Sequence, residues 1–248
     1  MFIIQDKTEW LKRVREEWTM KLSDIRGVAS WQKALGHTDW RIRAMAIRSL
    51  GIHSSKISLP LLVKALTDKH AVVRMAALDT CTLQCQHIPV LLVEVALTDL
   101  EVGVRAKAAW ALSYFAECVP VDRLTQVVED GTEDIAVRVS ALYTLAIAGP
   151  WMPLGVVLVA LEDECYQLRE MAALSLRHCA GCAVIPPLSQ ALHDAEPRVR
   201  AAAALTLGCF GKRVPETALQ AMLTDKVAVV REAVAWALEA RCRDNGTG

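Results

Sequence analysis

The sequence is poor in aromatic residues, glycine and proline, and it has no excess of charge of either sign. Aromatic side chains make up 5% of the 248 residues, which include 12 glycines and 9 prolines. These amounts exclude a collagen-like or low-complexity chain. The 28 basic and 28 acidic residues cancel, which disfavours a protein whose whole surface binds nucleic acid. The hydrophobic fraction of 53% excludes general disorder, and the abundance of Ala, Leu and Val favours helices.

Signals for export and for membrane insertion are also missing. No secretory leader pattern follows Met1, and eight cysteines are too few for a small disulfide-stabilised domain, so we expect a reducing, cytoplasmic environment. One uncharged stretch, residues 139–161, is 23 residues long and so reaches the roughly 20 residues of a membrane span. Gly149 and Pro150 interrupt it near its midpoint. We therefore predict two helices joined by a turn there, and no membrane contact.

A repeat runs through the chain. A hydrophobic residue followed by arginine recurs seven times, and the arginines are 31, 31, 33, 31, 31 and 31 residues apart. The repeat arginines are Arg43, Arg74, Arg105, Arg138, Arg169, Arg200 and Arg231. An aspartate stands six residues before the arginine in five repeats; Asp130 stands two residues further back in the longer fourth repeat, and His37 takes the position in the first. Apolar residues one before and three, four and seven after each arginine share one helix face, so an amphipathic helix is predicted at each arginine.

A shorter apolar helix is predicted before each of these helices. Residues 59–66 and 185–192 are examples, and prolines such as Pro60 and Pro186 suit the first turn of such a helix. Neither helix of a pair can bury its apolar face alone, so consecutive pairs must stack. We predict an all-α, right-handed α-solenoid of seven helix pairs over residues 24–243. A cap helix over residues 1–23 precedes it and a polar tail over residues 244–248 follows it.

The repeat resembles the short HEAT-like repeat, an armadillo-like α-solenoid unit. The pattern is visible in Ala65-Leu66, Asp68, Val73-Arg74 and Ala77, and the resemblance covers about residues 24 to 243. It implies that the aspartates and arginines tie each turn to the next repeat. It also implies that the second helices line the concave surface. The fold hosts many functions, so function must be inferred from a site.

Two columns of the repeat depart from the HEAT-like pattern. The position five residues after the arginine points away from the core, where such repeats usually carry charge, yet its last five members are apolar. We predict an apolar concave groove, formed with the position nine residues after the arginine, that binds a peptide or an amphipathic helix of a protein partner. The alternative is that these side chains pack against adjacent repeats or lie under a further segment. The predicted partner-binding residues are Trp110, Tyr114, Tyr143, Ile147, Leu174, His178, Leu205 and Trp236, with Arg48 and Asp79 as a charged end.

Other functional classes find less support in the sequence. Binding of nucleic acid requires a basic surface, but Arg48 and His178 are the only basic residues of the two columns. Some HEAT-like enzymes hold iron on His-Glu dipeptides, and this chain has no such dipeptide. His178, Cys179, Cys182 and Cys209 make one candidate zinc site, which lacks a second Cys-x-x-Cys. A metal or pigment enzyme stays the remote alternative. We therefore predict a scaffold protein that is not an enzyme, with no catalytic residue, metal or cofactor.

The predicted last repeat has no cap comparable to residues 1–23. After Leu238 the sequence becomes polar and rich in Gly. One face of the last helix pair would then lack a neighbour. We expect a dimer or a longer solenoid to form through the carboxy-terminal repeat.

Overall fold

The computed structural model describes residues 27–54, 57–115, 118–179 and 181–243. These residues form helices and turns, without a strand. They divide into two compact units, which we call unit 1, up to Ile88, and unit 2, from Pro89 onward. The predicted cap helix and polar tail lie outside the described residues. The single solenoid over residues 24–243 stays a prediction from the repeat register.

Unit 1 contains two helix pairs. The first pair is α2 (Val28–Ala34) and α3 (Trp40–His53), and the second is α4 (Leu59–Leu66) and α5 (Ala71–Leu83), with a short 3-10 turn η1 (Cys85–His87) after it. Asp39 begins α3 as its N-cap, because its carboxylate accepts a hydrogen bond from the N–H of Arg41 at 2.9 Å. Pro60 occupies the first turn of α4, where its missing N–H costs nothing.

Unit 2 contains five helix pairs, in which several helices end in a 3-10 turn. The first helices are α6 (Leu91–Glu94, continued by η2, Val95–Thr98), α8 (Val121–Glu129), α10 (Leu154–Ala160), α12 (Ile185–Ala191) and α14 (Glu216–Gln220, continued by η9, Ala221–Thr224). The second helices are α7 (Val102–Ala111, continued by η3, Leu112–Tyr114), α9 (Ile135–Ile147), α11 (Tyr166–Ser175, continued by η6, Leu176–His178), α13 (Pro197–Gly208) and α15 (Ala228–Arg243).

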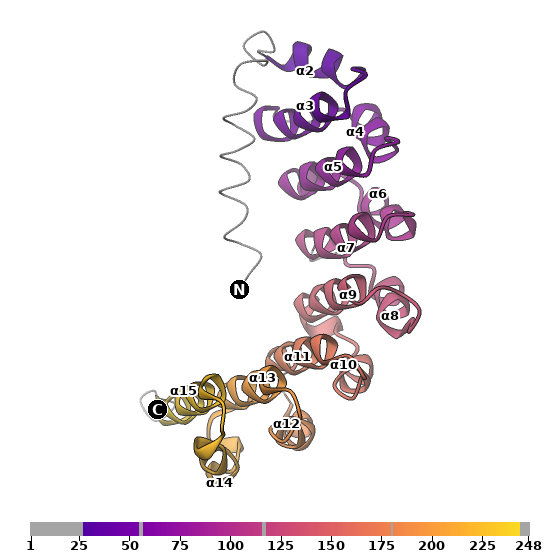
Figure 1. Ribbon diagram of the computed structural model, residues 1–248. Coiled ribbons are helices and arrows are strands. Elements are labelled where there is room, and N and C mark those ends of the chain that lie inside the picture. The colour runs from indigo at the N-terminus through magenta and orange to yellow at the C-terminus, as the bar shows by residue number, and fades with distance from the viewer. Residues whose placement is uncertain (1–26, 55–56, 116–117, 180, 244–248) are drawn as a thin grey trace. The chain divides into compact units, whose positions relative to one another are not determined.

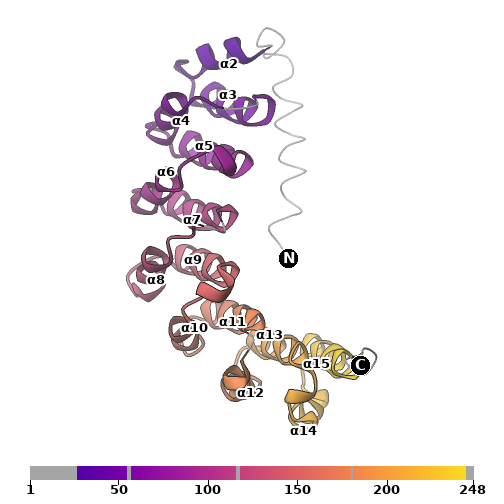
Figure 2. The ribbon, with the colours of Figure 1, turned by 180° about the vertical axis from the view of Figure 1, so that it is seen from behind.

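The two kinds of helix form two layers in unit 2. Figure 1 shows α7, α9, α11, α13 and α15 in one row, with α8, α10, α12 and α14 in a second row beside it. The view from behind shows the same two rows (Figure 2). The core lies between the rows and between successive second helices. Its centre is formed by the repeated leucines Leu112, Leu145, Leu176 and Leu207, which are fully buried. The predicted all-α solenoid architecture of helix pairs is confirmed.

Small residues allow the second helices to approach closely. A methyl group on Gly208 would lie 2.7 Å from the Cα of Ala237 in α15, which is shorter than a van der Waals contact allows. In unit 1, a methyl group on Gly51 would lie 2.9 Å from the side chain of Thr80. Glycine is therefore required at both positions by the distance between neighbouring helices, not by a positive φ.

Buried threonine hydroxyl groups also join neighbouring second helices. Thr144 in α9 donates to the carbonyl oxygen of Ala109 in α7 at 2.6 Å, and Thr206 in α13 donates to that of Ala173 in α11 at 2.9 Å. Both threonines are six residues after a repeat arginine. These polar groups are buried but satisfied, so they fix how one helix is placed along the next.

The uncharged stretch 139–161 is divided as predicted. It consists of most of α9, the turn η5 (Gly149–Trp151) and all of α10, and Gly149 has a φ of 60° that suits glycine. None of the described helices is long and apolar enough to cross a membrane.

Candidate functional site

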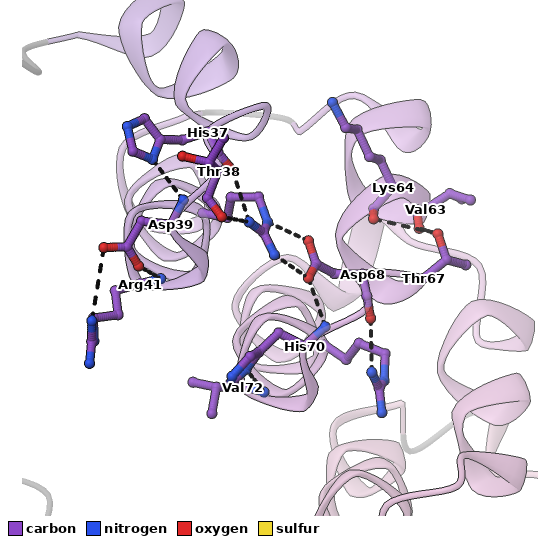
Figure 3. Close-up of polar contacts among 12 residues, drawn as sticks. His37, Thr38, Asp39, Arg41, Val63, Lys64, Thr67, Asp68, His70 and Val72 are labelled. Atoms are coloured by element: carbon purple, nitrogen blue, oxygen red, sulfur yellow. Dashed lines mark hydrogen bonds and ion pairs between the residues drawn. The ribbon is translucent and has the colours of Figure 1, made fainter.

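The repeated charges form a ladder of ion pairs, which we call the arginine ladder. In unit 1, Arg43 donates from Nε and Nη2 to the two carboxylate oxygens of Asp68, at 2.6 and 2.7 Å. Its Nη1 donates to the carbonyl oxygens of His37 and Thr38 in its own turn (Figure 3). Oδ1 of Asp68, which accepts from Nη2 of Arg43, also accepts from the N–H of His70 at 2.9 Å. Arg43 thus ties the turn before α3 to the turn before α5, as the sequence resemblance implied.

The ladder continues through unit 2 with the same geometry. Arg169 binds Asp194 at 2.7 and 2.9 Å, and Arg200 binds Asp225 at 2.8 and 2.9 Å, each through Nε and Nη2. In each case Nη1 donates to carbonyl oxygens of the arginine's own turn. Charged groups that meet in this fork geometry form the stronger kind of hydrogen bond. The side chains of these arginines and aspartates are thus engaged in structural ion pairs between successive turns.

One acid of the ladder is not the one that the register indicated. From its place in the sequence, Asp130 was predicted to be the ladder acid of the longer fourth repeat. In the structure, Arg105 binds Glu133 at 2.8 and 2.7 Å, while Asp130 accepts hydrogen bonds from the N–H and the hydroxyl group of Thr132. The two extra residues enlarge the turn, so that Asp130 closes the turn and a longer side chain reaches the arginine.

The ion pairs lower the pKa of the carboxyl groups. The hydrogen bonds from Arg105 lower the pKa of Glu133, and they outweigh the partial burial that acts to raise it. The hydrogen bonds from Arg200 and from the N–H of Val227 lower the pKa of Asp225. These shifts have a structural cause, and they do not indicate a catalytic acid or base.

The side chains predicted to bind a partner lie on the second helices, and eight of them belong to unit 2. Tyr114, Tyr143, Ile147 and Trp236 are exposed by 48%, 39%, 37% and 42%, and His178 is exposed as well. Trp110, Leu174 and Leu205 are half-buried. We call these eight residues the apolar strip. The neighbouring described repeats thus leave five of the eight side chains exposed and partly cover the other three, and the partner of the strip stays a prediction.

Both tryptophans of the strip are held in place by neighbours. Trp110 meets Tyr114 edge to face at 5.0 Å between ring centroids, and the ammonium group of Lys107 lies 4.4 Å from the centroid of Trp110. The ring of Trp236 lies against Gly208, since a methyl group there would be 3.2 Å from it. Ala202 and Ala233, small residues on the same helices as Leu205 and Trp236, are buried. Rigid aromatic side chains beside small residues are suited to bind another apolar surface.

Arg48 and Asp79 belong to unit 1 and are paired with each other. Nη2 of Arg48 lies 2.7 Å from a carboxylate oxygen of Asp79, and thus joins α3 to α5. Both side chains are partly exposed. The role predicted for them, as a charged end that fixes the direction of a ligand, therefore competes with this ion pair.

An exposed tryptophan escaped the sequence analysis. Trp151 is 78% exposed in the turn η5, four residues after Ile147. The repeat register could not single it out, because this turn has no counterpart column of aromatic residues in the other repeats. The signal for Trp151 that the sequence did offer was its place directly after the turn-forming residues Gly149 and Pro150.

Three cavities of the described residues lie away from the strip. One, in unit 1, is lined by residues of α2, α3 and α4, among them His53 and Ser54. The others lie at the arginine ladder, around His193 and Asp194. None of these three cavities is lined by a residue of the strip. No three His, Cys, Asp or Glu side chains gather as metal ligands in the part of the chain that the structure describes.

The comparison with known families agrees with the geometry. The family model described as HEAT repeats matches residues 18–81 and 155–239, which together are more than half of the chain. The chain belongs to the HEAT-repeat family, and the resemblance seen in the sequence is confirmed. No curated protein sequence matches the chain.

Solved structures with TM-scores of 0.66 and 0.55 share the fold at low sequence identity, and a third gives a weaker match. The X-ray structure of YibA from Escherichia coli is 18% identical, with a TM-score of 0.66 and coverage of 98% of each chain. The complex of CpcE and CpcF of phycocyanin lyase from Nostoc sp. PCC7120 contains a chain that is 18% identical, with a TM-score of 0.55; the match covers 90% of this chain and 89% of that one. Human deoxyhypusine hydroxylase is 20% identical over 94% of this chain and 91% of its own, with a TM-score of 0.45.

The prediction that the chain is not an enzyme is wrong. It was drawn from the lack of familiar catalytic motifs, but a phycocyanin lyase has the same fold, at a TM-score of 0.55. HEAT-type helix pairs are thus compatible with an enzyme. The fold by itself establishes a repeat scaffold and leaves the chemistry to its surface side chains.

Proposed function

We propose that the apolar strip binds an amphipathic helix or peptide segment of a protein partner. The observation that supports this proposal is the exposure of Tyr114 at the end of α7, Tyr143 and Ile147 on α9, and Trp236 on α15, all in one compact unit. Exposed apolar side chains that gather on one face mark interaction surfaces in soluble proteins. Trp and Tyr are also the residues most enriched among those that dominate binding energy.

The spacing of the second helices suits a helical ligand. Packed helices are about 8–10 Å apart. A helix rises about 1.5 Å per residue, so residues seven apart on a ligand helix are separated by roughly 10 Å. A ligand helix lying across α9, α11 and α13 would therefore present one apolar residue to each. The hydroxyl groups of Tyr114 and Tyr143 and the imidazole of His178 supply polar partners at its edge.

The test compares capture of partners by the wild-type chain and by a Trp110→Ala/Trp236→Ala double variant. Equal helicity of the two proteins is first established by circular dichroism. A matched control is the Leu100→Ala/Val159→Ala variant, because both residues are exposed and lie outside the strip. We expect the double variant to lose the partner while the control retains it. Each tryptophan should contribute about 2 kcal/mol, or roughly 30-fold in Kd, in a calorimetric titration with the identified partner.

Equal capture by the wild type and the double variant would overturn the proposal. Unfolding of the double variant would assign the two tryptophans to the core. In that case a Tyr143→Ala variant, which removes a side chain that is 39% exposed, provides the second measurement of the same surface.

A further inference from the structure

The cavity of unit 1 is a candidate site of its own. It lies among α2, α3 and α4, and its described lining includes no residue of the apolar strip or of the arginine ladder. Its volume is about 250 Å³. One water molecule requires roughly 10–15 Å³, and pockets for drug-sized ligands begin at about 300 Å³. The space is therefore far larger than one water and suits a small organic molecule.

A buried hydroxyl group at this cavity lacks a hydrogen-bond partner. Ser54 follows α3 and lines the cavity. Its hydroxyl oxygen is buried and, in the part of the chain that the structure describes, it is the one buried side-chain nitrogen or oxygen atom without a partner. Buried polar groups are nearly always hydrogen-bonded, because an unpaired one keeps the full cost of losing its water. The cavity is the place where a partner of Ser54 can bind.

The side chain of Gln84 fixes the backbone that carries Ser54. Its Nε2 donates to the carbonyl oxygens of Gly51 and Ser54 at 3.1 and 2.9 Å. Its Oε1 accepts from the N–H of Ile57 at 2.8 Å, and Gln84 itself is buried. One buried amide group thus holds the lining residues Ser54 and Ile57 in place. A lining that is already ordered lowers the entropy cost of binding a ligand.

The charges around the cavity favour an anion. No Asp or Glu is among the described residues that line it. Ser58 lines it as the N-cap of α4, and its hydroxyl group is not used for a capping hydrogen bond. The amino end of a helix carries the positive end of the helix dipole. Residues 27–88 also contain eight Lys and Arg against three Asp. A carboxylate therefore fits beside Ser54 and Ser58 better than a cation does.

The rest of the lining is largely apolar. Leu50 and Ile57 are buried, and Leu61 is half-buried. The ring of His53, which also lines the cavity, stacks on the indole of Trp31 with 5.0 Å between the ring centroids. A short hydrocarbon body gains from leaving water for such a lining. The ligand that matches the cavity is thus apolar at one end and anionic at the other.

We propose that the cavity of unit 1 binds a small organic acid. Its carboxylate accepts hydrogen bonds from the hydroxyl groups of Ser54 and Ser58, and its short apolar body lies against Leu50, Ile57 and Leu61. The carboxylate provides the partner that the buried hydroxyl group of Ser54 lacks. This inference is independent of the function proposed for the apolar strip, because the two sites belong to different units.

Four defined probes test the class of ligand on the full-length chain. Hexanoate, hexanamide, acetate and inorganic phosphate are titrated at constant ionic strength, and the backbone amide signals of Ser54 and Ile57 are followed by NMR. We expect hexanoate to shift both signals saturably. Hexanamide has the same shape without the charge, acetate lacks the hydrocarbon chain and phosphate lacks an apolar body, so each should bind at least about tenfold more weakly. Equal binding of any of these three, or no saturable shift with hexanoate, would overturn the proposal.

A pair of serine variants tests the role of the buried hydroxyl group. Ser54→Ala should weaken hexanoate binding about tenfold and leave resistance to urea unchanged or higher, because the hydroxyl group that it removes has no partner in the fold. Ser49→Ala is the matched control, since Ser49 is a half-buried serine of α3 that does not line the cavity, and it should bind hexanoate as the wild type does. Unchanged affinity of Ser54→Ala, or a loss of stability in it, would overturn the proposal.

Discussion

Arg105 binds the carboxylate of Glu133 through two hydrogen bonds of 2.8 and 2.7 Å, although Asp130 is the acid that the repeat pattern placed opposite it. Asp130 instead accepts from Thr132 within the enlarged turn. The ladder thus stays continuous across the one repeat that has two extra residues, because a glutamate takes the place of an aspartate. The two-hydrogen-bond geometry of the ion pair is kept, although the carboxylate comes from a glutamate and not from an aspartate.

Replacement of these two acids should therefore have different effects on stability. Glu133→Ala leaves Arg105 without its partner in a partly buried place, and we expect it to lower the free energy of unfolding by about 2 kcal/mol. Asp130→Ala removes turn hydrogen bonds at an exposed position and should lower the free energy of unfolding less than Glu133→Ala does. Urea unfolding followed by circular dichroism measures both. A larger loss for Asp130→Ala would show that the turn, and not the ion pair, stabilises this repeat.

The lowered pKa of Glu133 makes stability depend on pH. Because the unfolded chain binds this proton more readily than the folded chain, the contribution is complete above the unfolded value near 4.5 and is lost as the pH falls through the lower folded pKa. We expect the free energy of unfolding to fall below about pH 4.5, with a shallower slope in Glu133→Gln. Glu129→Gln is the control, since exposed Glu129 makes no ion pair in the described residues. Parallel curves for wild type and Glu133→Gln would contradict the assignment.

Two glycine replacements should differ in sign. In Gly208→Ala the new methyl group would lie 2.7 Å from the Cα of Ala237, so α13 and α15 must separate, at a cost of about 1–3 kcal/mol. In Gly155→Ala the methyl group meets no atom within 4 Å, and better helix propensity should stabilise α10 by up to about 1 kcal/mol. Thermal unfolding of both variants checks this expectation. Equal stability of Gly208→Ala and the wild type would mean that α15 adjusts without strain.

The buried threonine hydroxyl groups should contribute measurably. Thr206→Val keeps the shape of the side chain but removes the hydrogen bond to the carbonyl oxygen of Ala173, and we expect a loss of about 1 kcal/mol. Thr224→Val removes a hydroxyl group that bonds within its own exposed turn, and should change stability by less than about 0.5 kcal/mol. Chemical denaturation distinguishes the two. A loss no greater than that of the control would mean that the packing of α11 on α13 does not depend on this bond.

Most of the fold could be predicted from the sequence, because the repeat is a periodic pattern along the chain. The spacing of the arginines located every second helix, and the apolar residues before and after each arginine, such as Val199 and Ala203, identified the buried face. Glu133 was missed because an insertion shifts which acid reaches Arg105. Thr206 was missed because a hydroxyl group six residues after an arginine gives no sign of a partner in the preceding repeat.

The exposure of the candidate site followed the sequence pattern only in part. The column five residues after the arginine predicted an exposed apolar face; Tyr143 and Trp236 are exposed, whereas the other three apolar members, Trp110, Leu174 and Leu205, are half-buried. The pairing of Arg48 with Asp79 was not predicted, although the two residues are one repeat length of 31 positions apart in the same column. Trp151 stands outside the register, so only the structure reveals how exposed it is.

The sequence alone determined that the chain is a stack of helix pairs and which face of each second helix is buried, because the helical period and the repeat length are local properties. Tertiary structure decided which charges pair and where helices touch too closely for any side chain larger than glycine. Those outcomes depend on distances between successive repeats. Such distances are set by the packing of whole helices and by side chains from two repeats at once.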